Sequence, residues 1–167
     1  TDGYWNLMKG EALGLRAFHY FDLLRLYGPV YSEDPEMKCL PWRTEFNADQ
    51  KSLESAGVIA QHILEDLTQA EELLKDDPLN YKNDLNNPFL GLRKHRMKAL
   101  MARVYLWIGD KENAALKAKE VIEQCGLELV ISNIQDASLY DETIFCLGMD
   151  DMANKLKDDW KSINTYS

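Results

Sequence analysis

The sequence predicts an all-α chain, a helical array joined by long irregular loops. Apolar residues recur at steps of three and four over four separate stretches, which is the spacing of a buried helix face. These stretches are divided by runs rich in Pro, Gly, Asn and Asp, which favour turns and loops. With 167 residues and 46% hydrophobic content, the chain is long enough to form one domain with its own core.

The first predicted helix covers about residues 5–27 and is apolar around most of its circumference. Its polar side chains form one narrow stripe, made by Arg16, His19, Asp22 and Arg25. We therefore expect this helix to be packed on more than one side. Gly28 and Pro29 follow it and end it, because proline cannot continue a helix.

The remaining elements follow from the same patterns. We expect a long loop over residues 28–50, where prolines and acidic residues are scattered. A second helix is predicted over about 52–74, a third over about 94–108 and a fourth over about 111–125. For residues 127–167 we predict an extended and irregular segment. We expect it to be an incomplete continuation of the same domain. The buried side of the second helix is predicted to comprise Ala56, Ile59, Ala60, Ile63, Leu67, Ala70 and Leu74.

The third and fourth helices together match a tetratricopeptide unit. That repeat is a helix, a tight turn and a second helix, with small residues where the two cross. Gly109 and Asp110 fall at its turn, and Ala114 and Ala118 fall at its close-packing positions. The first and second predicted helices show the same helix–turn–helix pattern, with a long insertion between them. The sequence thus predicts a tetratricopeptide-like helical core over residues 1–126.

Charge and motif content limit the possible functions. The formal charge is −9, and nucleic-acid binding requires a basic surface, so we expect no nucleic-acid partner. We find no paired carboxylates on buried helices and no nucleophile beside a base, so we predict no enzyme, no cofactor and no metal site. The segment MDDMAN (149–154) resembles a magnesium-diphosphate motif of all-helical prenyl-transfer enzymes, but so short a match is frequent by chance.

Five segments, in order between residues 9 and 147, resemble the SusD/RagB family of cell-surface nutrient-binding lipoproteins of Bacteroidetes. They are GEALGLRAFHYFDLLRLYGPVY (10–31), LPWRTEF (40–46), ILEDLTQAEELL (63–74), RKHRMKALMARVYLWIGDKENAALKAKEVI (93–122) and DETIFCL (141–147). One such match would be weak, and five in the right order make the resemblance specific.

The resemblance implies a tetratricopeptide core with irregular loops and a function without chemistry. Such proteins bind glycans or oligosaccharides, or in some members peptides, and deliver them to a SusC-like TonB-dependent barrel transporter. They lie at the cell surface of the outer membrane, anchored by a lipidated N-terminal Cys, so membrane contact is expected only through an anchor outside this chain. Family members are longer, so we expect this chain to be their central helical part. The alternative is a generic tetratricopeptide adaptor that binds other proteins.

Two places combine an aromatic ring with planar polar groups, as sugar binding requires. Trp42 lies beside Arg43 in the long loop, and Tyr81 lies among asparagines in the connection after the second helix. These residues are our candidates for ligand binding. The alternative, which we favour, is structural: Trp42 anchors its loop onto the helices and Tyr81 is a hydrophobic staple. No binding residue of the family can be carried over to this chain.

Overall fold

The computed structural model describes residues 2–47, 49–75, 93–125 and 144. Within these residues the protein is mostly helical, with four helices and a small two-stranded sheet. The elements follow in the order α1 (Asp2–Tyr27), β1 (Lys38–Pro41), β2 (Leu53–Ser55), α2 (Ala56–Leu73), α3 (Arg93–Ile108) and α4 (Lys111–Gln124). Apart from residue 144, the predicted extended segment 127–167 lies outside the described residues.

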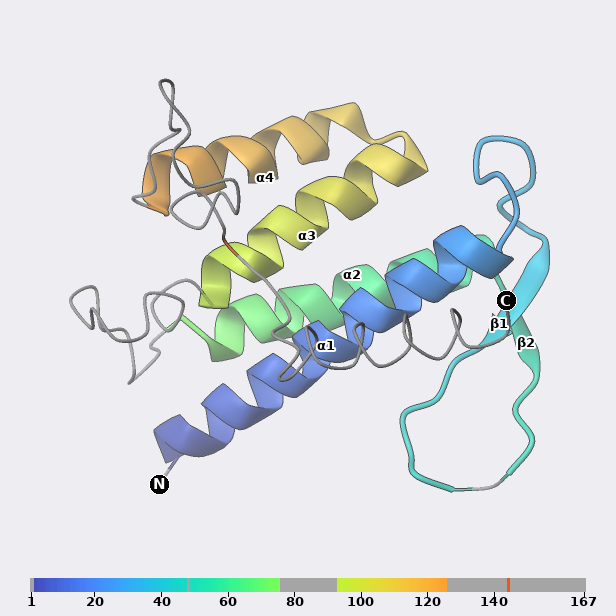
Figure 1. The fold of residues 1–167 in the computed structure, drawn as a ribbon, viewed down its shortest axis with the longest axis horizontal. Coiled ribbons are helices and arrows are strands. Elements are labelled where there is room, and N and C mark those ends of the chain that lie inside the picture. Colours follow the sequence, from blue (N-terminus) through green and yellow to red (C-terminus); the bar gives the residue numbers. More distant parts are fainter. Residues whose placement is uncertain (1, 48, 76–92, 126–143, 145–167) are drawn as a thin grey trace, which may run out of the picture.

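Helices that are consecutive in the chain lie side by side (Figure 1). Each helix runs opposite to the one before it, so that α1 and α2 form one antiparallel pair and α3 and α4 a second. The two pairs meet mainly where α2 contacts α3. Strands β1 and β2 pair antiparallel at the end of the helices where α1 finishes and α2 begins.

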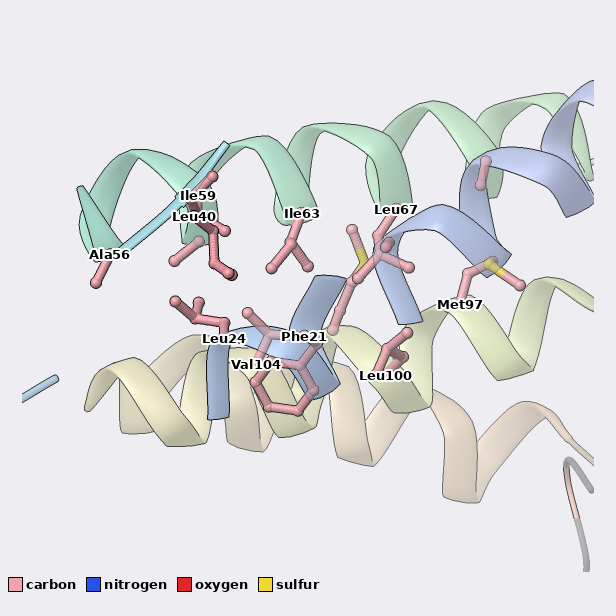
Figure 2. Close-up of a cluster of buried hydrophobic side chains, with 14 of the residues drawn as sticks. Phe21, Leu24, Leu40, Ala56, Ile59, Ile63, Leu67, Met97, Leu100 and Val104 are labelled. Carbon is pink, nitrogen blue, oxygen red and sulfur yellow. The ribbon is translucent and has the colours of Figure 1, made fainter. Parts of the chain in front are cut away.

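The core lies between α1, α2 and α3, with one residue contributed by β1 (Figure 2). The side chains of α2 point toward those of α3, and Phe21 and Leu24 of α1 fill the space between them. The predicted buried side of α2 is confirmed. Its members are 0–2% exposed, namely Ala56, Ile59, Ala60, Ile63, Leu67, Ala70 and Leu74.

Two glycines let α1 approach its neighbours closely. A β-carbon added at Gly10 would lie 2.8 Å from Cγ of Leu74, just after α2. A β-carbon at Gly14 would overlap the sulfur of Met97 in α3. Because both positions lack a side chain, the backbone of α1 packs directly against the side chains of Leu74 and Met97.

The turn predicted at Gly109 and Asp110 is confirmed. Gly109 has φ of 88°, in the left-handed region that favours glycine, and it ends α3. The Asp110 side chain accepts a hydrogen bond from the backbone N–H of Asn113 at 3.0 Å and so caps α4. Hydrogen bonds from the Asn113 side chain and backbone also lower the pKa of the Asp110 carboxyl.

The start of the second predicted helix is wrong by four residues. The stretch 52–55 was expected to be helical, but residues Leu53–Ser55 form β2 and pair with β1. Ser55 then caps α2, because its backbone is extended and its hydroxyl accepts from the N–H of Val58 at 3.4 Å. The loop 28–50 is likewise not wholly irregular, since it contains β1.

The first helix contacts α2, α3 and β1, so it is packed on more than one side, but its outer side is exposed in the described structure. Ala17 and Leu24 face the core and are 0% exposed, whereas Leu15 and Leu26 on the opposite side are 42% and 73% exposed. Apolar residues therefore occur on the outer side of this helix as well as on its inner side.

Four charged side chains join α2, α3 and α4. Lys98 Nζ lies 2.8 Å from Glu120 Oε2 and 3.6 Å from Glu71 Oε1. Lys117 Nζ lies 3.0 Å from Glu71 Oε2 and 3.5 Å from Glu120 Oε2. Positive and negative groups therefore alternate around a closed ring. Burial lowers the pKa of Lys117, but its contacts with Glu71 and Glu120 outweigh this and raise it overall.

We predict that Glu120 makes the stability of the protein depend on pH in the acid range. The hydrogen bond from Lys98, aided by the charge of Lys117, lowers the pKa of Glu120 below its ordinary value of 4.5. Its stabilising contribution is therefore present above pH 4.5 and is lost as the pH falls through the lowered pKa. In urea unfolding, Glu120→Gln should reduce the free energy of unfolding at pH 7, and this deficit should shrink at pH 3.

The control is Glu123→Gln. Glu123 pairs only with exposed Lys119 in the described structure, at 3.7 Å, so its replacement should change stability little at either pH. An equal deficit for Glu120→Gln at both pH values would contradict the prediction.

Candidate functional site

Trp42 lies immediately after β1 and packs over the pair formed by α1 and α2. Its ring is stacked on that of His62 from α2, with centroids 4.9 Å apart and planes 21° apart. On the side of α1, the Tyr20 ring centroid is 4.3 Å away, and Cζ of Arg16 lies 5.1 Å from the Trp42 ring centroid. These contacts come from both helices, as expected of a residue that anchors its loop.

The backbone on both sides of Trp42 is held by one hydroxyl group. Tyr20 Oη donates a hydrogen bond to the carbonyl oxygen of Pro41 at 3.0 Å. The same oxygen accepts a hydrogen bond from the backbone N–H of Arg43 at 2.9 Å. The end of β1 and the beginning of the following loop are therefore tied to the middle of α1.

A bidentate ion pair between Arg16 and Asp66 lies next to the Trp42 ring. Arg16 Nε lies 2.6 Å from Asp66 Oδ2, and Arg16 Nη2 lies 2.7 Å from Asp66 Oδ1. The Asp66 side chain is 5% exposed and that of Arg16 is 29% exposed. The hydrogen bond with Asp66 raises the pKa of the Arg16 guanidinium, which keeps its charge beside the buried carboxylate.

His62 connects the helix to the small sheet. Its Nε2 lies 3.1 Å from a carboxylate oxygen of Glu54 in β2, and its Nδ1 lies 3.3 Å from one of Glu65 in α2. Only the doubly protonated ring can donate to both carboxylates at once. The imidazole thus has a carboxylate at each nitrogen and Trp42 against its face.

Arg43 shapes the loop that follows Trp42. Its guanidinium donates to the backbone carbonyls of Asn47 at 3.2 Å and Asp49 at 2.9 Å, which closes residues 43–49 into a compact turn. Phe46 lies within this turn and is fully exposed. The neighbouring Asn47 side chain donates a hydrogen bond to the Glu45 carboxylate at 3.0 Å, and the Phe46 ring remains in water.

The three candidate residues from the sequence are not brought together. Trp42 and Arg43 are neighbours, but Trp42 contributes to packing and Arg43 to the shape of the loop. Tyr81 and the segment 149–154 lie outside the described residues. Sequence reasoning missed Phe46, although it is the one aromatic residue in the polar run TEFNADQ. It also missed Tyr20 and His62, whose shared contact with Trp42 is distant in sequence.

Chemically, this region is suited to binding. An open aromatic ring can stack on the C–H face of a sugar, and adjacent carboxylate and amide groups can hydrogen-bond to hydroxyls. No group of three or more His, Cys, Asp or Glu residues that could hold a metal ion occurs in the part of the chain that the structure describes. In that same part, no helix has the length and hydropathy of a membrane span.

No family model matches the chain, and a search of curated proteins finds no match to it. We therefore infer the function of the protein from its residues and from the contacts between them.

We predict that removing Arg16 destabilises the protein far more than removing another arginine of the same helix. Arg16→Leu leaves the Asp66 carboxylate buried without its partner, which should cost about 3 kcal/mol of unfolding free energy. Arg25→Leu is the matched control, because Arg25 pairs with the exposed Asp22 one turn away, and it should cost less than about 0.5 kcal/mol. Urea unfolding at pH 7 measures both, and similar losses would contradict a special role for the buried pair.

We predict that Tyr20→Phe loosens the loop without unfolding the helices. The substitution keeps the ring against Trp42 but removes both hydrogen bonds of the hydroxyl, at a cost of about 1–2 kcal/mol. Hydrogen exchange should become faster in residues 38–47 and remain unchanged in α3. Tyr27→Phe is the control, since Tyr27 is 67% exposed. Unchanged exchange in residues 38–47 would show that the hydroxyl does not hold the loop.

Proposed function

We propose that this chain is the central, tetratricopeptide-like part of a SusD-like binding protein. Such a protein captures a glycan or oligosaccharide at the cell surface and delivers it to a TonB-dependent outer-membrane transporter, without catalysing a reaction. In this proposal the lipid anchor lies outside the chain, and the helices serve as a framework for the loops.

One observation carries the proposal: the segments on which the resemblance depends contact one another. Arg16 of the first segment binds Asp66 of the third. Trp42 of the second segment packs against Arg16 and against Tyr20 of the first. These contacts support the view that the resembling segments belong to one structural unit.

The last two segments extend the same set of contacts. Trp107 of the fourth segment packs against Phe21 and Tyr31 of the first, with ring centroids 6.0 Å and 5.0 Å apart. Arg96, also in the fourth segment, donates from Nε to the carbonyl oxygen of Ile144 in the fifth, at 3.0 Å. All five segments are therefore linked by side-chain contacts.

The arrangement of the helices supports a tetratricopeptide-like array. Two antiparallel helix pairs lie in chain order, and a left-handed glycine at Gly109 joins the helices of the second pair. Ala114 is 7% exposed at the contact of α4 with α3, where the repeat places a small residue.

We propose the turn 43–49 as the ligand-contacting part of this framework, with Phe46 as the stacking ring. Phe46→Ala should then weaken glycan binding at least about tenfold without changing stability, because its side chain is fully exposed. Met37→Ala is the control in the same loop, since Met37 is 50% exposed and lies outside the turn. Trp42→Ala should instead lower stability.

The decisive experiment is a pull-down of the protein from detergent-solubilised outer membranes of cells that make it, with partners identified by mass spectrometry. Recovery of a TonB-dependent barrel, with lipid on an N-terminal Cys, supports the proposal and makes a glycan panel the next step. Recovery of soluble partners only, with no lipid, overturns it in favour of the tetratricopeptide adaptor.

A further inference from the structure

Two arginines from different helices lie over the ring of Phe21. Cζ of Arg25, one turn later in α1, is 5.1 Å from the ring centroid, and Cζ of Arg103 in α3 is 5.9 Å from it. Phe21 is 2% exposed and belongs to the core between α1 and α3 (Figure 2), whereas both arginines are exposed. The two arginines therefore bring positive charge to the surface where these helices meet.

The two arginines differ in how their charge is balanced. Arg25 forms an ion pair with Asp22, three positions before it in α1. The side chain of Arg103 forms neither an ion pair nor a hydrogen bond with the residues that the structure describes. One positive charge is thus left without a carboxylate partner there, on a chain whose net charge is −9.

The contact with Phe21 prepares these arginines for a ligand. A guanidinium group carries five N–H donors in a rigid fork, and that fork matches the two oxygens of a carboxylate. The N–H groups that do not face the Phe21 ring remain available to a ligand. Because the ring already limits the positions of both groups, they lose less conformational entropy when a ligand binds.

Two partly exposed aromatic rings lie beside the arginines. The ring centroid of Trp107 is 6.0 Å from that of Phe21, and the ring centroid of Tyr31, in the loop after α1, is 5.0 Å from that of Trp107. Trp107 follows Arg103 by four positions in α3, so the two side chains share one side of the helix. Such rings offer a face on which the C–H groups of a sugar can stack.

We propose that these side chains form a binding site for an acidic sugar, the uronic acid unit of a glycan. The site comprises Asp22, Arg25, Tyr31, Arg103 and Trp107. Arg103 binds the carboxylate, the Arg25–Asp22 pair supplies a donor and an acceptor for sugar hydroxyls, and Trp107 supplies the stacking ring. The site shares no residue with the turn 43–49. It rests on the proposed function only in taking a glycan as the source of the sugar.

Two other anionic ligands fit these side chains less well. A phosphate dianion calls for a second uncompensated cation, but Asp22 already balances the charge of Arg25. The C-terminal carboxylate of a peptide could pair with Arg103. However, it brings no hydroxyl groups to the donor and acceptor of the Arg25–Asp22 pair, whereas a uronic acid brings both a carboxylate and hydroxyls.

Titration of the whole chain with glucuronate and, separately, with glucose tests this proposal. NMR signals of the Trp107 indole N–H and the Arg103 Nε–H should shift with glucuronate in a saturable way. The dissociation constant should be about tenfold lower for glucuronate than for glucose, because only the acid forms charge-assisted hydrogen bonds with Arg103. High salt should reduce this difference, because both arginines are exposed.

Arg103→Gln should raise the dissociation constant of glucuronate about tenfold and leave that of glucose unchanged. Lys119→Gln is the matched control, because it removes the same charge from α4 at a side chain that is 71% exposed, and it should change neither constant. Arg103 is itself exposed, so urea unfolding should show that both variants remain folded.

Equal dissociation constants for glucuronate and glucose, an equal loss in the two variants, or shifts confined to other residues would each overturn the proposal. Tighter binding of a peptide with a free C-terminal carboxylate than of glucuronate would overturn it in favour of a peptide site. If glucuronate binds as expected but the pull-down recovers no barrel, the site stands and the transport function fails.

Discussion

The carboxylate of Asp66 lies inside the contact between α1 and α2, where an unpaired charge would cost several kcal/mol. Arg16 must therefore point toward α2, and this requirement sets the rotation of α1 about its own axis. With that rotation, Phe21 and Leu24 face the core, whereas Leu15 and Leu26 face away from it. Trp42 and the loop that carries it then pack over the side of the ion pair. Much of the first helical pair follows from this one requirement.

Apolar burial and polar pairing have different roles in this fold. The core residues of α2 and α3 supply the favourable free energy of burial, but close-packed leucines and isoleucines alone tolerate several registers. The charged ring of Glu71, Lys98, Lys117 and Glu120 adds a directional constraint, since alternating charges fit together in one register of α2, α3 and α4. The second helical pair is thus aligned with the first by electrostatics as well as by shape.

The sequence predicted most of the helical framework because helices are local. The spacing of Ile59, Ile63 and Leu67 and the turn at Gly109 depend on residues a few positions apart. The two-stranded sheet escaped prediction, since strands of three and four residues are too short to show alternation and form only by pairing across the loop. The partners Arg16 and Asp66 are 50 positions apart, and no local pattern connects them.

Apolar composition also could not distinguish an inner from an outer face. Leu24 and Leu26 look alike in the sequence, yet one is 0% and the other 73% exposed, because what decides their burial is which neighbour lies beside each of them. The candidate site of the sequence analysis and the turn proposed from the structure share one loop but not the same residues. Trp42 and Arg43 are recognisable in the sequence, whereas the exposure of Phe46 accompanies hydrogen bonds from Arg43 to backbone carbonyls that the sequence does not reveal.

The double hydrogen bond of the Tyr20 hydroxyl has a mechanical consequence. A surface loop normally absorbs a displacement at its tip by nanosecond rearrangement of its own backbone. Here the base of the turn is fastened to α1 on both sides of Trp42, and Arg43 stiffens the turn itself. We therefore expect a displacement of the base of this loop to be coupled to a displacement of α1, because the Tyr20 hydroxyl joins the two.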